Sequence, residues 1–169
     1  RCHRLLGRIA AFLTILLVLL GVRVSIEATR VNPPDMMMFG LTMKQFMAIP
    51  FLTILSFGGY VFFGVLYRKR PEIHRPLMLM ASLTVVSAAT GRMPALNAWY
   101  AGTWLEVLLT TYFATMAVGA LMFAAKCAVS RRFDRGFAIA YGSILLTSVA
   151  ISLIARTPVW NALAGFLLR

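Results

Sequence analysis

Acidic residues are scarce in this chain. Asp and Glu contribute 5 of its 169 residues against 17 Lys and Arg, and charged residues together make up 13%, whereas about 25% is typical of soluble domains. A disordered chain is excluded because such chains are polar and poor in aromatic residues, while this one is 60% apolar. A soluble fold is disfavoured, since a body of this size cannot bury so much apolar surface. The composition therefore predicts a multi-pass membrane protein.

Cysteine and histidine are also rare, with two of each. Cys2 and Cys127 form neither a C-x-x-C motif nor a disulfide framework. The sequence has no Gly-rich phosphate loop, no H-E-x-x-H motif and no Ser/His/Asp set. No acidic residue falls in the middle of an apolar run, which weakens an assignment as a proton pump or an ion-coupled transporter.

Long apolar runs are present instead. A membrane-spanning helix needs about 20 mostly apolar residues, and arginines that flank a shorter run can extend it by reaching back to the interface. The first run also has the pattern of a signal peptide, which is the alternative to a span. We predict an all-α, polytopic transmembrane helical bundle, formed by one membrane domain with five spans near 5–26, 45–67, 77–96, 105–125 and 137–155 and an interfacial segment at 158–168.

The basic residues follow the predicted loops. With the N-terminus inside, eleven Lys and Arg fall on the inner side and six on the outer side, with the densest clusters at 68–70 and 131–132. Because short inner loops carry the excess of positive charge, we expect a bacterial inner-membrane protein with a cytoplasmic N-terminus and a periplasmic C-terminus. The expected partners are the lipid bilayer and its anionic headgroups, not nucleic acid. The oligomeric state stays open.

Small residues and aromatic residues mark two further features. Small side chains recur four residues apart in the third predicted span, as in Thr84/Ala88 and Ser87/Gly91, so this helix can approach its neighbours closely. We expect it to be the central helix. On the outer side we expect an aromatic belt at the interface, formed by Trp99, Tyr100, Trp104 and Trp160.

The two histidines are candidate cofactor ligands. His3 and His74 each precede an inside-to-outside span and are each followed by arginine, which places them on one membrane face at similar depth. Neutral imidazole is a common ligand of haem iron, so the pair is compatible with one bis-histidine haem b. The alternative is a structural role, in which each histidine lies at the membrane interface beside an arginine. For His74, Pro76 favours a helix start at this point.

A charged cluster is expected at the opposite face. Arg92 lies near the outer end of the third span, Glu106 begins the fourth and Arg156 follows the fifth. Ionisable groups at this depth are usually paired, so we expect an ion pair between Arg92 and Glu106 with Arg156 close by. The cluster suits either a structural ion pair or a site for an anion or a quinone headgroup.

Several motifs resemble those of a group of bacterial multi-pass membrane proteins without an assigned activity. Residues 3–7 (HRLLG) are similar to its H-R-R-L-G, and residues 68–79 (RKRPEIHRPLML) to its R-R-R-P-x-x-H-K-R-L-M-L. Residues 92–94 (RMP) and 157–160 (TPVW) are similar to its A-R-x-P and T-P-x-W. The resemblance covers the whole chain. It implies an N-terminally truncated sequence, with about two further spans upstream and a Leu-His-Gly whose histidine is another candidate ligand.

The sequence leaves three functions open. The first is an integral inner-membrane protein of unassigned activity, more in keeping with a non-enzymatic role. The second is a haem-binding electron-transfer protein, with His3 and His74 as axial ligands and a quinone or anion site at Arg92, Glu106 and Arg156. The third is a small-solute transporter, for which the apolar runs contain few polar residues.

Overall fold

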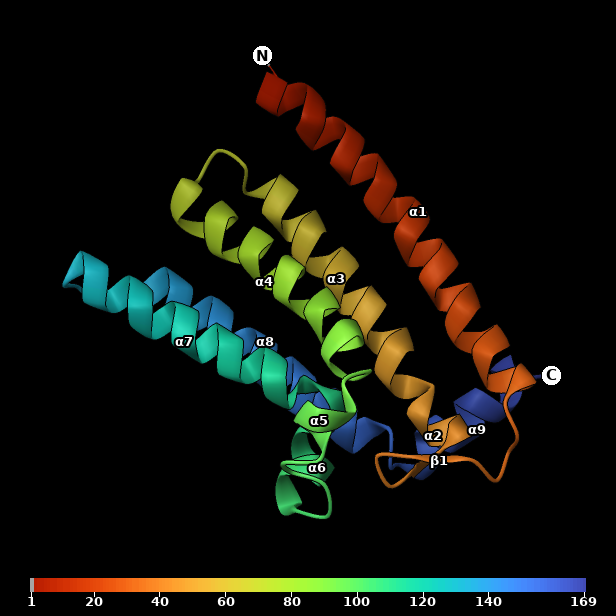
Figure 1. The fold of residues 1–169 in the computed structure, drawn as a ribbon. Coiled ribbons are helices and arrows are strands. Elements are labelled where there is room, and N and C mark those ends of the chain that lie inside the picture. Colours follow the sequence, from red (N-terminus) through yellow and green to blue (C-terminus); the bar gives the residue numbers. More distant parts are fainter. Residues whose placement is uncertain (1) are drawn as a thin grey trace.

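Helices make up nearly the whole chain. The computed structural model describes residues 2–169 and the side chains of residues 5–169 (Figure 1). The long helices are α1 (Cys2–Val31), α3 (Ala48–Leu66), α4 (Pro71–Thr90), α7 (Phe113–Ser130) and α8 (Arg135–Ile154). The short elements are the strand pair β1 (Met37–Met38) and β2 (Leu41–Thr42), the helices α2 (Met43–Phe46), α5 (Pro94–Asn97), α6 (Trp104–Leu109) and α9 (Pro158–Leu167), and the 3₁₀ turn η1 (Thr110–Tyr112).

Four helical stretches are long and apolar enough to cross a membrane: Leu5–Val31, Met43–Leu66, Trp104–Ser130 and Arg135–Ile154. About 79% of the residues are helical, so the predicted all-α class is confirmed apart from the two-residue strands. Helix α4 is not among the four, because Glu72, His74 and Arg75 occupy its first two turns. Its 20 residues are nevertheless as long as those of α8.

The long helices alternate in direction and α4 lies among them. In Figure 1, α1, α3 and α4 run side by side, while α7 and α8 form a hairpin that leans away from them. Helix α4 packs against α3 on one side and against α7 and α8 on the other, which confirms its predicted central position. Its buried small residues Thr84 and Ser87 allow this close packing.

Two helices differ in extent from the predicted spans. The second span is interrupted at Met47, between α2 and α3, because Pro50 has no N–H to donate to the carbonyl of Phe46. Helix α4 begins at Pro71, earlier than position 77, and ends at Thr90 rather than near 96. Pro94 then starts the short helix α5, since proline disfavours helical geometry in the residue before it.

The four residues of the expected aromatic belt differ in exposure. Trp99 and Trp104 are exposed, whereas Tyr100 and Trp160 are 2% and 3% exposed. The Trp160 Nε1–H donates to the carbonyl of Lys44, 2.9 Å away, and its ring packs edge-on against Phe51. Trp160 therefore fixes α9 against α2 and α3, because a backbone carbonyl rather than interfacial water satisfies its indole.

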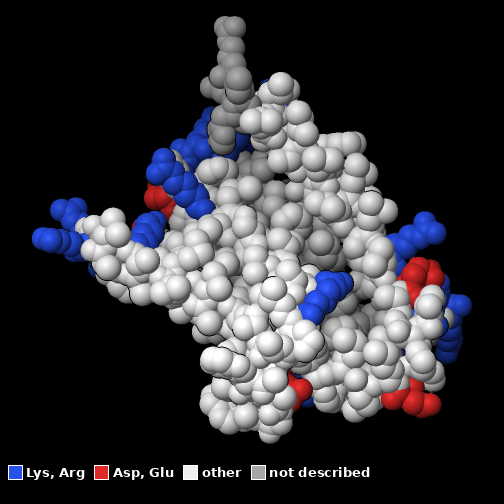
Figure 2. Space-filling view, in the orientation of Figure 1, with Lys and Arg blue, Asp and Glu red and all other residues white. Residues whose placement is uncertain are grey.

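The outer surface is largely apolar. Figure 2 shows a face that is mostly uncharged, with Lys and Arg gathered mainly toward its edges. Along α1, Leu5, Phe12 and Leu19 are 61–63% exposed. Contiguous apolar surface of this kind is rare on soluble monomers and typical of surfaces that contact lipid or another protein.

Candidate functional site at the broken helix

The stretch from Trp104 to Ser130 is not one continuous helix. Helix α6 ends at Leu109, the 3₁₀ turn η1 follows, and α7 begins at Phe113. The break occurs at Thr110, whose backbone angles are φ 44° and ψ −114°. Left-handed φ is a marked outlier for a β-branched residue, and such strain persists only where the surrounding structure imposes it. Six residues of α6 place the break about 9 Å from the helix start.

Buried hydroxyl groups surround the break. The Tyr100 hydroxyl donates to the carbonyl of Thr110 at 2.7 Å, which satisfies a backbone group that the broken helix leaves free. The Thr110 hydroxyl pairs with that of Ser152 on α8, 3.2 Å away, and the Tyr112 hydroxyl pairs with that of Thr53 on α3. All five side chains are buried. Three elements therefore make polar contacts here in addition to apolar ones.

Thr115 is the exception within this polar region. It lies on the first turn of α7 and is 1% exposed, yet its hydroxyl oxygen has no hydrogen-bond partner among the described residues. A threonine in a helix usually donates to a carbonyl of the preceding turn, as Thr84 does in α4. An unpartnered buried hydroxyl costs about 1–3 kcal/mol, a cost that a polar group reaching this oxygen would remove.

Arg156 and Tyr100 are ionisable groups near the break, and the charge of Glu106 influences both. Arg156 is half-buried and its Nη1 donates to the carbonyl of Ser152 at 2.7 Å. Burial lowers the pKa of the Arg156 guanidinium and the charge of Glu106 opposes this shift, but arginine stays protonated. Burial, and secondly Glu106, raise the pKa of the Tyr100 phenol, so Tyr100 remains a hydrogen-bond donor. Arg156 thus supplies a positive charge that is held beside the backbone of Ser152.

The expected ion pair between Arg92 and Glu106 does not form. The Arg92 Nη1 donates back to the carbonyl of Ala88 on its own helix, and the Glu106 Oε2 accepts from the Gly102 N–H at 2.6 Å. The reason is the early end of α4 at Thr90, which leaves Arg92 within reach of a free terminal carbonyl. Of the three predicted residues, Glu106 lies near enough to Arg156 to affect its pKa, but among the described residues no two of the three form an ion pair.

Of the two histidines, the structure describes the side chain of His74 alone. The side chain of His3 lies outside the described residues. His74 is half-buried near the start of α4, and its Nδ1 is 2.7 Å from the carbonyl of Gly64 at the end of α3. Since only the protonated nitrogen donates to a carbonyl, this contact fixes the tautomer in which Nε2 carries the free lone pair. That orientation is typical of metal-ligating histidines, but it also joins two helices.

Sequence reasoning did not single out the broken helix as a site. It predicts one span at 105–125, in which Thr110, Thr111, Tyr112 and Thr115 pack against other helices, with hydrogen bonds across helices or the lining of a path as the alternatives. A cluster of hydroxyl residues within six positions of an apolar run was the available signal. Residues 104–113 contain neither glycine nor proline, so no typical helix-breaking residue predicts the break.

The break, the Thr115 hydroxyl and Arg156 together form the candidate site. No family model, no curated protein and no solved structure matches the chain.

Proposed function

We propose that the chain is an integral protein of a bacterial inner membrane with five spans. Helix α4 is then a span in addition to the four long apolar stretches. Its 20 residues rise about 30 Å and the apolar part after Arg75 about 22 Å, a shortfall that local thinning of the bilayer and reaching arginine side chains can make up. Its charged first turns then lie at the headgroup level, beside the basic cluster 68–70. The N-terminus is cytoplasmic and the C-terminus periplasmic, because eleven of the 17 basic residues then lie inside.

Cys127 provides a direct test of this orientation. It lies one turn before the end of α7, next to the basic cluster 131–132. In a Cys2→Ser background, a membrane-impermeant maleimide should label Cys127 in inside-out vesicles and leave it unmodified in intact spheroplasts. Labelling of intact spheroplasts alone would invert the proposed orientation.

Within this membrane protein, we infer a binding site for a small anionic solute at the break between α6 and α7, of the kind used by transporters. Discontinuous membrane helices expose backbone groups to a ligand, and they are common at transporter binding sites. The observation that carries the proposal is the unpartnered, buried hydroxyl of Thr115, below a strained Thr110. Arg156 at the outer end selects for negative charge.

Accessibility to charged thiol reagents tests the site without knowledge of the solute. In a background with Cys2 and Cys127 replaced by serine, Thr115→Cys should react in spheroplasts with the anionic reagent methanethiosulfonate ethylsulfonate. An added Arg156→Gln should lower this rate by about tenfold, since a single positive charge focuses anions in a cleft. The same Arg156→Gln change should not lower the rate with a cationic methanethiosulfonate, when each rate is divided by the rate of that reagent with a free thiol in solution.

Leu121→Cys is the matched control, because Leu121 lies on the same helix α7 but is 71% exposed on its outer face. In a bilayer this side chain contacts hydrocarbon, so neither charged reagent should label it. Ser152→Cys, a near-isosteric change at the same site, repeats the test if Thr115→Cys does not fold. Folded variants that stay unlabelled at positions 115 and 152 would show a closed packing core and overturn the solute site.

A second candidate, a haem-binding membrane protein, is supported by the contact between His74 and Gly64. His74 fits an axial ligand through its free Nε2, and haem would supply one-electron chemistry there. The second ligand would be His3. Full-length protein purified from haem-replete cells should then show a reduced-minus-oxidised α-band that disappears in His74→Ala. A featureless visible spectrum would exclude haem and leave His74 as a link between α3 and α4.

A further inference from the structure

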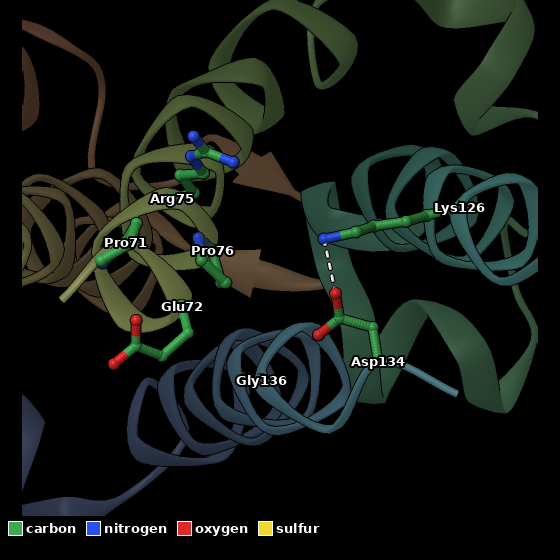
Figure 3. Close-up of a pocket in the computed structure, with 7 residues that line it drawn as sticks. All are labelled: Pro71, Glu72, Arg75, Pro76, Lys126, Asp134 and Gly136. Carbon is green, nitrogen blue, oxygen red and sulfur yellow. Dashed lines mark ion pairs between the residues drawn. The ribbon is translucent and has the colours of Figure 1, made fainter. Parts of the chain in front are cut away.

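A charged cavity lies between three helix ends, at the end of α7 opposite the break. It has a volume of about 330 Å³ and opens at the start of α4, the end of α7 and the start of α8. Figure 3 shows Glu72 and Arg75 on α4, and Lys126 on α7 reaching toward Asp134 before α8. Pro76 and Gly136 form its walls.

The cavity carries both signs of charge in a chain that is poor in acids. Two of the five acidic residues, Glu72 and Asp134, line it together with the cations Arg75 and Lys126. The neighbouring basic clusters at 68–70 and 131–132 contain no acid at all. An anionic lipid would need only cations. Since Asp134 is paired with Lys126, the Glu72 carboxylate is the group that favours a ligand with a positive group as well.

One of these ion pairs is already made and holds the wall in place. The Lys126 Nζ is 2.6 Å from the Asp134 Oδ2, and the Asp134 Oδ1 accepts from the Phe137 N–H at 2.8 Å. The hydrogen bond from Lys126 keeps the pKa of the Asp134 carboxyl below its usual value. Asp134 thus caps α8 and positions Lys126, whose remaining N–H groups can still donate.

The other two charges have no protein partner. Among the described residues, neither the Glu72 carboxylate nor the Arg75 guanidinium makes an ion pair or a side-chain hydrogen bond. Helices α4 and α8 both begin at the cavity, and the positive ends of their dipoles favour an anionic group there. A Cβ at Gly136 would lie 2.9 Å from the carbonyl oxygen of Glu72, so glycine lets the two helix starts meet.

The cavity lies at the headgroup level if the proposed membrane placement holds. Trp104–Ser130 and Arg135–Ile154 are both long and apolar enough to cross a membrane, so the turn between them is at the membrane surface. We propose that the cavity binds the headgroup of phosphatidylethanolamine, with its phosphate at Arg75 and Lys126 and its ammonium group at Glu72. A volume of about 330 Å³ accommodates a phosphoethanolamine group, since a water molecule occupies about 30 Å³.

Native mass spectrometry of the full chain in mixed lipids tests this proposal. From equimolar phosphatidylethanolamine, phosphatidylcholine and phosphatidylglycerol, the protein should retain phosphatidylethanolamine preferentially. Phosphatidylcholine has the same charges but a methylated ammonium that cannot donate hydrogen bonds. Glu72→Gln should lower the retention of phosphatidylethanolamine relative to phosphatidylglycerol by about tenfold, the usual effect of one charge-assisted hydrogen bond. Arg75→Gln should weaken the binding of all three lipids.

Arg132→Gln is the control, because Arg132 lies in the turn between α7 and α8 but does not line the cavity. It should leave the ratio of the lipids unchanged. Soluble phosphoethanolamine should not displace the lipid at equal concentration, and equal competition would assign the cavity to a soluble ligand. Equal retention of the three lipids, or an unchanged ratio in Glu72→Gln, would overturn the proposal. Neither result bears on Thr115 labelling, so the solute site stands or falls separately.

Discussion

Replacing Tyr112 with alanine is expected to lower the free energy of unfolding by about 3–5 kcal/mol, the usual cost of truncating a buried aromatic side chain. Tyr112 is 1% exposed and among the largest fully buried side chains of the described residues. It follows the break directly and contacts Thr53 on α3, so its loss leaves a cavity where α3 and the broken helix meet. Steric trapping in lipid bicelles measures this free energy.

Tyr112→Phe separates the packing from the hydroxyl group. It keeps the ring and removes only the contact with Thr53, whose own hydroxyl still donates to the carbonyl of Ile49. Polar contacts between membrane helices contribute about 0.6 kcal/mol on average and about 1.7 at most, so the phenylalanine variant should lose no more than this. If it were as unstable as Tyr112→Ala, the hydroxyl network rather than the ring would hold the break together.

The long helices could be predicted from the sequence because long apolar runs leave a strong signal. Long uncharged runs must satisfy their backbone groups internally, which requires helices. The central position of α4 was likewise visible in its small residues, Thr84 and Ser87 among them. These features depend on local composition, which a single sequence displays directly.

The site could not be predicted because it depends on how helix ends meet. Arg92 and Glu106 have opposite charges and suitable positions in the chain, yet each finds a nearer backbone partner. The break at Thr110 is imposed by contacts with Tyr100 and Ser152, which lie 10 and 42 residues away in the sequence. Hydrogen bonds over such distances leave no periodic pattern. The sequence shows only the local excess of hydroxyl residues at 110–115.

The same distinction applies to the charged cavity at the starts of α4 and α8. The salt bridge between Lys126 and Asp134 spans a short turn and follows from chain proximity. The approach of Glu72 to Gly136 joins residues from two separate helices, and it is this contact that gathers four charges around one cavity. The proposed site at the broken helix and the charged cavity thus share an origin in close packing between helix ends, although their proposed ligands differ.

Close packing between α7 and α8 depends on Gly119, and Gly119→Ala is expected to destabilise the protein by about 1–3 kcal/mol, as overpacking usually does. A Cβ at this position would lie 2.6 Å from Cε2 and 3.0 Å from Cδ2 of the Tyr141 ring. The ring cannot simply swing aside, because the Tyr141 hydroxyl donates to the carbonyl of Met116 at 2.8 Å. The added methyl group therefore separates the helices or breaks that hydrogen bond.

Gly142→Ala is the matched control on the facing helix α8. No atom lies within 4 Å of a Cβ built at Gly142, so the same change should be neutral or stabilise the helix by up to about 1 kcal/mol. Thermal unfolding in one detergent compares the two variants directly. Because both changes remove a glycine from a helix, the difference between them isolates the contact with Tyr141. Equal stability of the two variants would mean that α7 and α8 do not pack at Gly119.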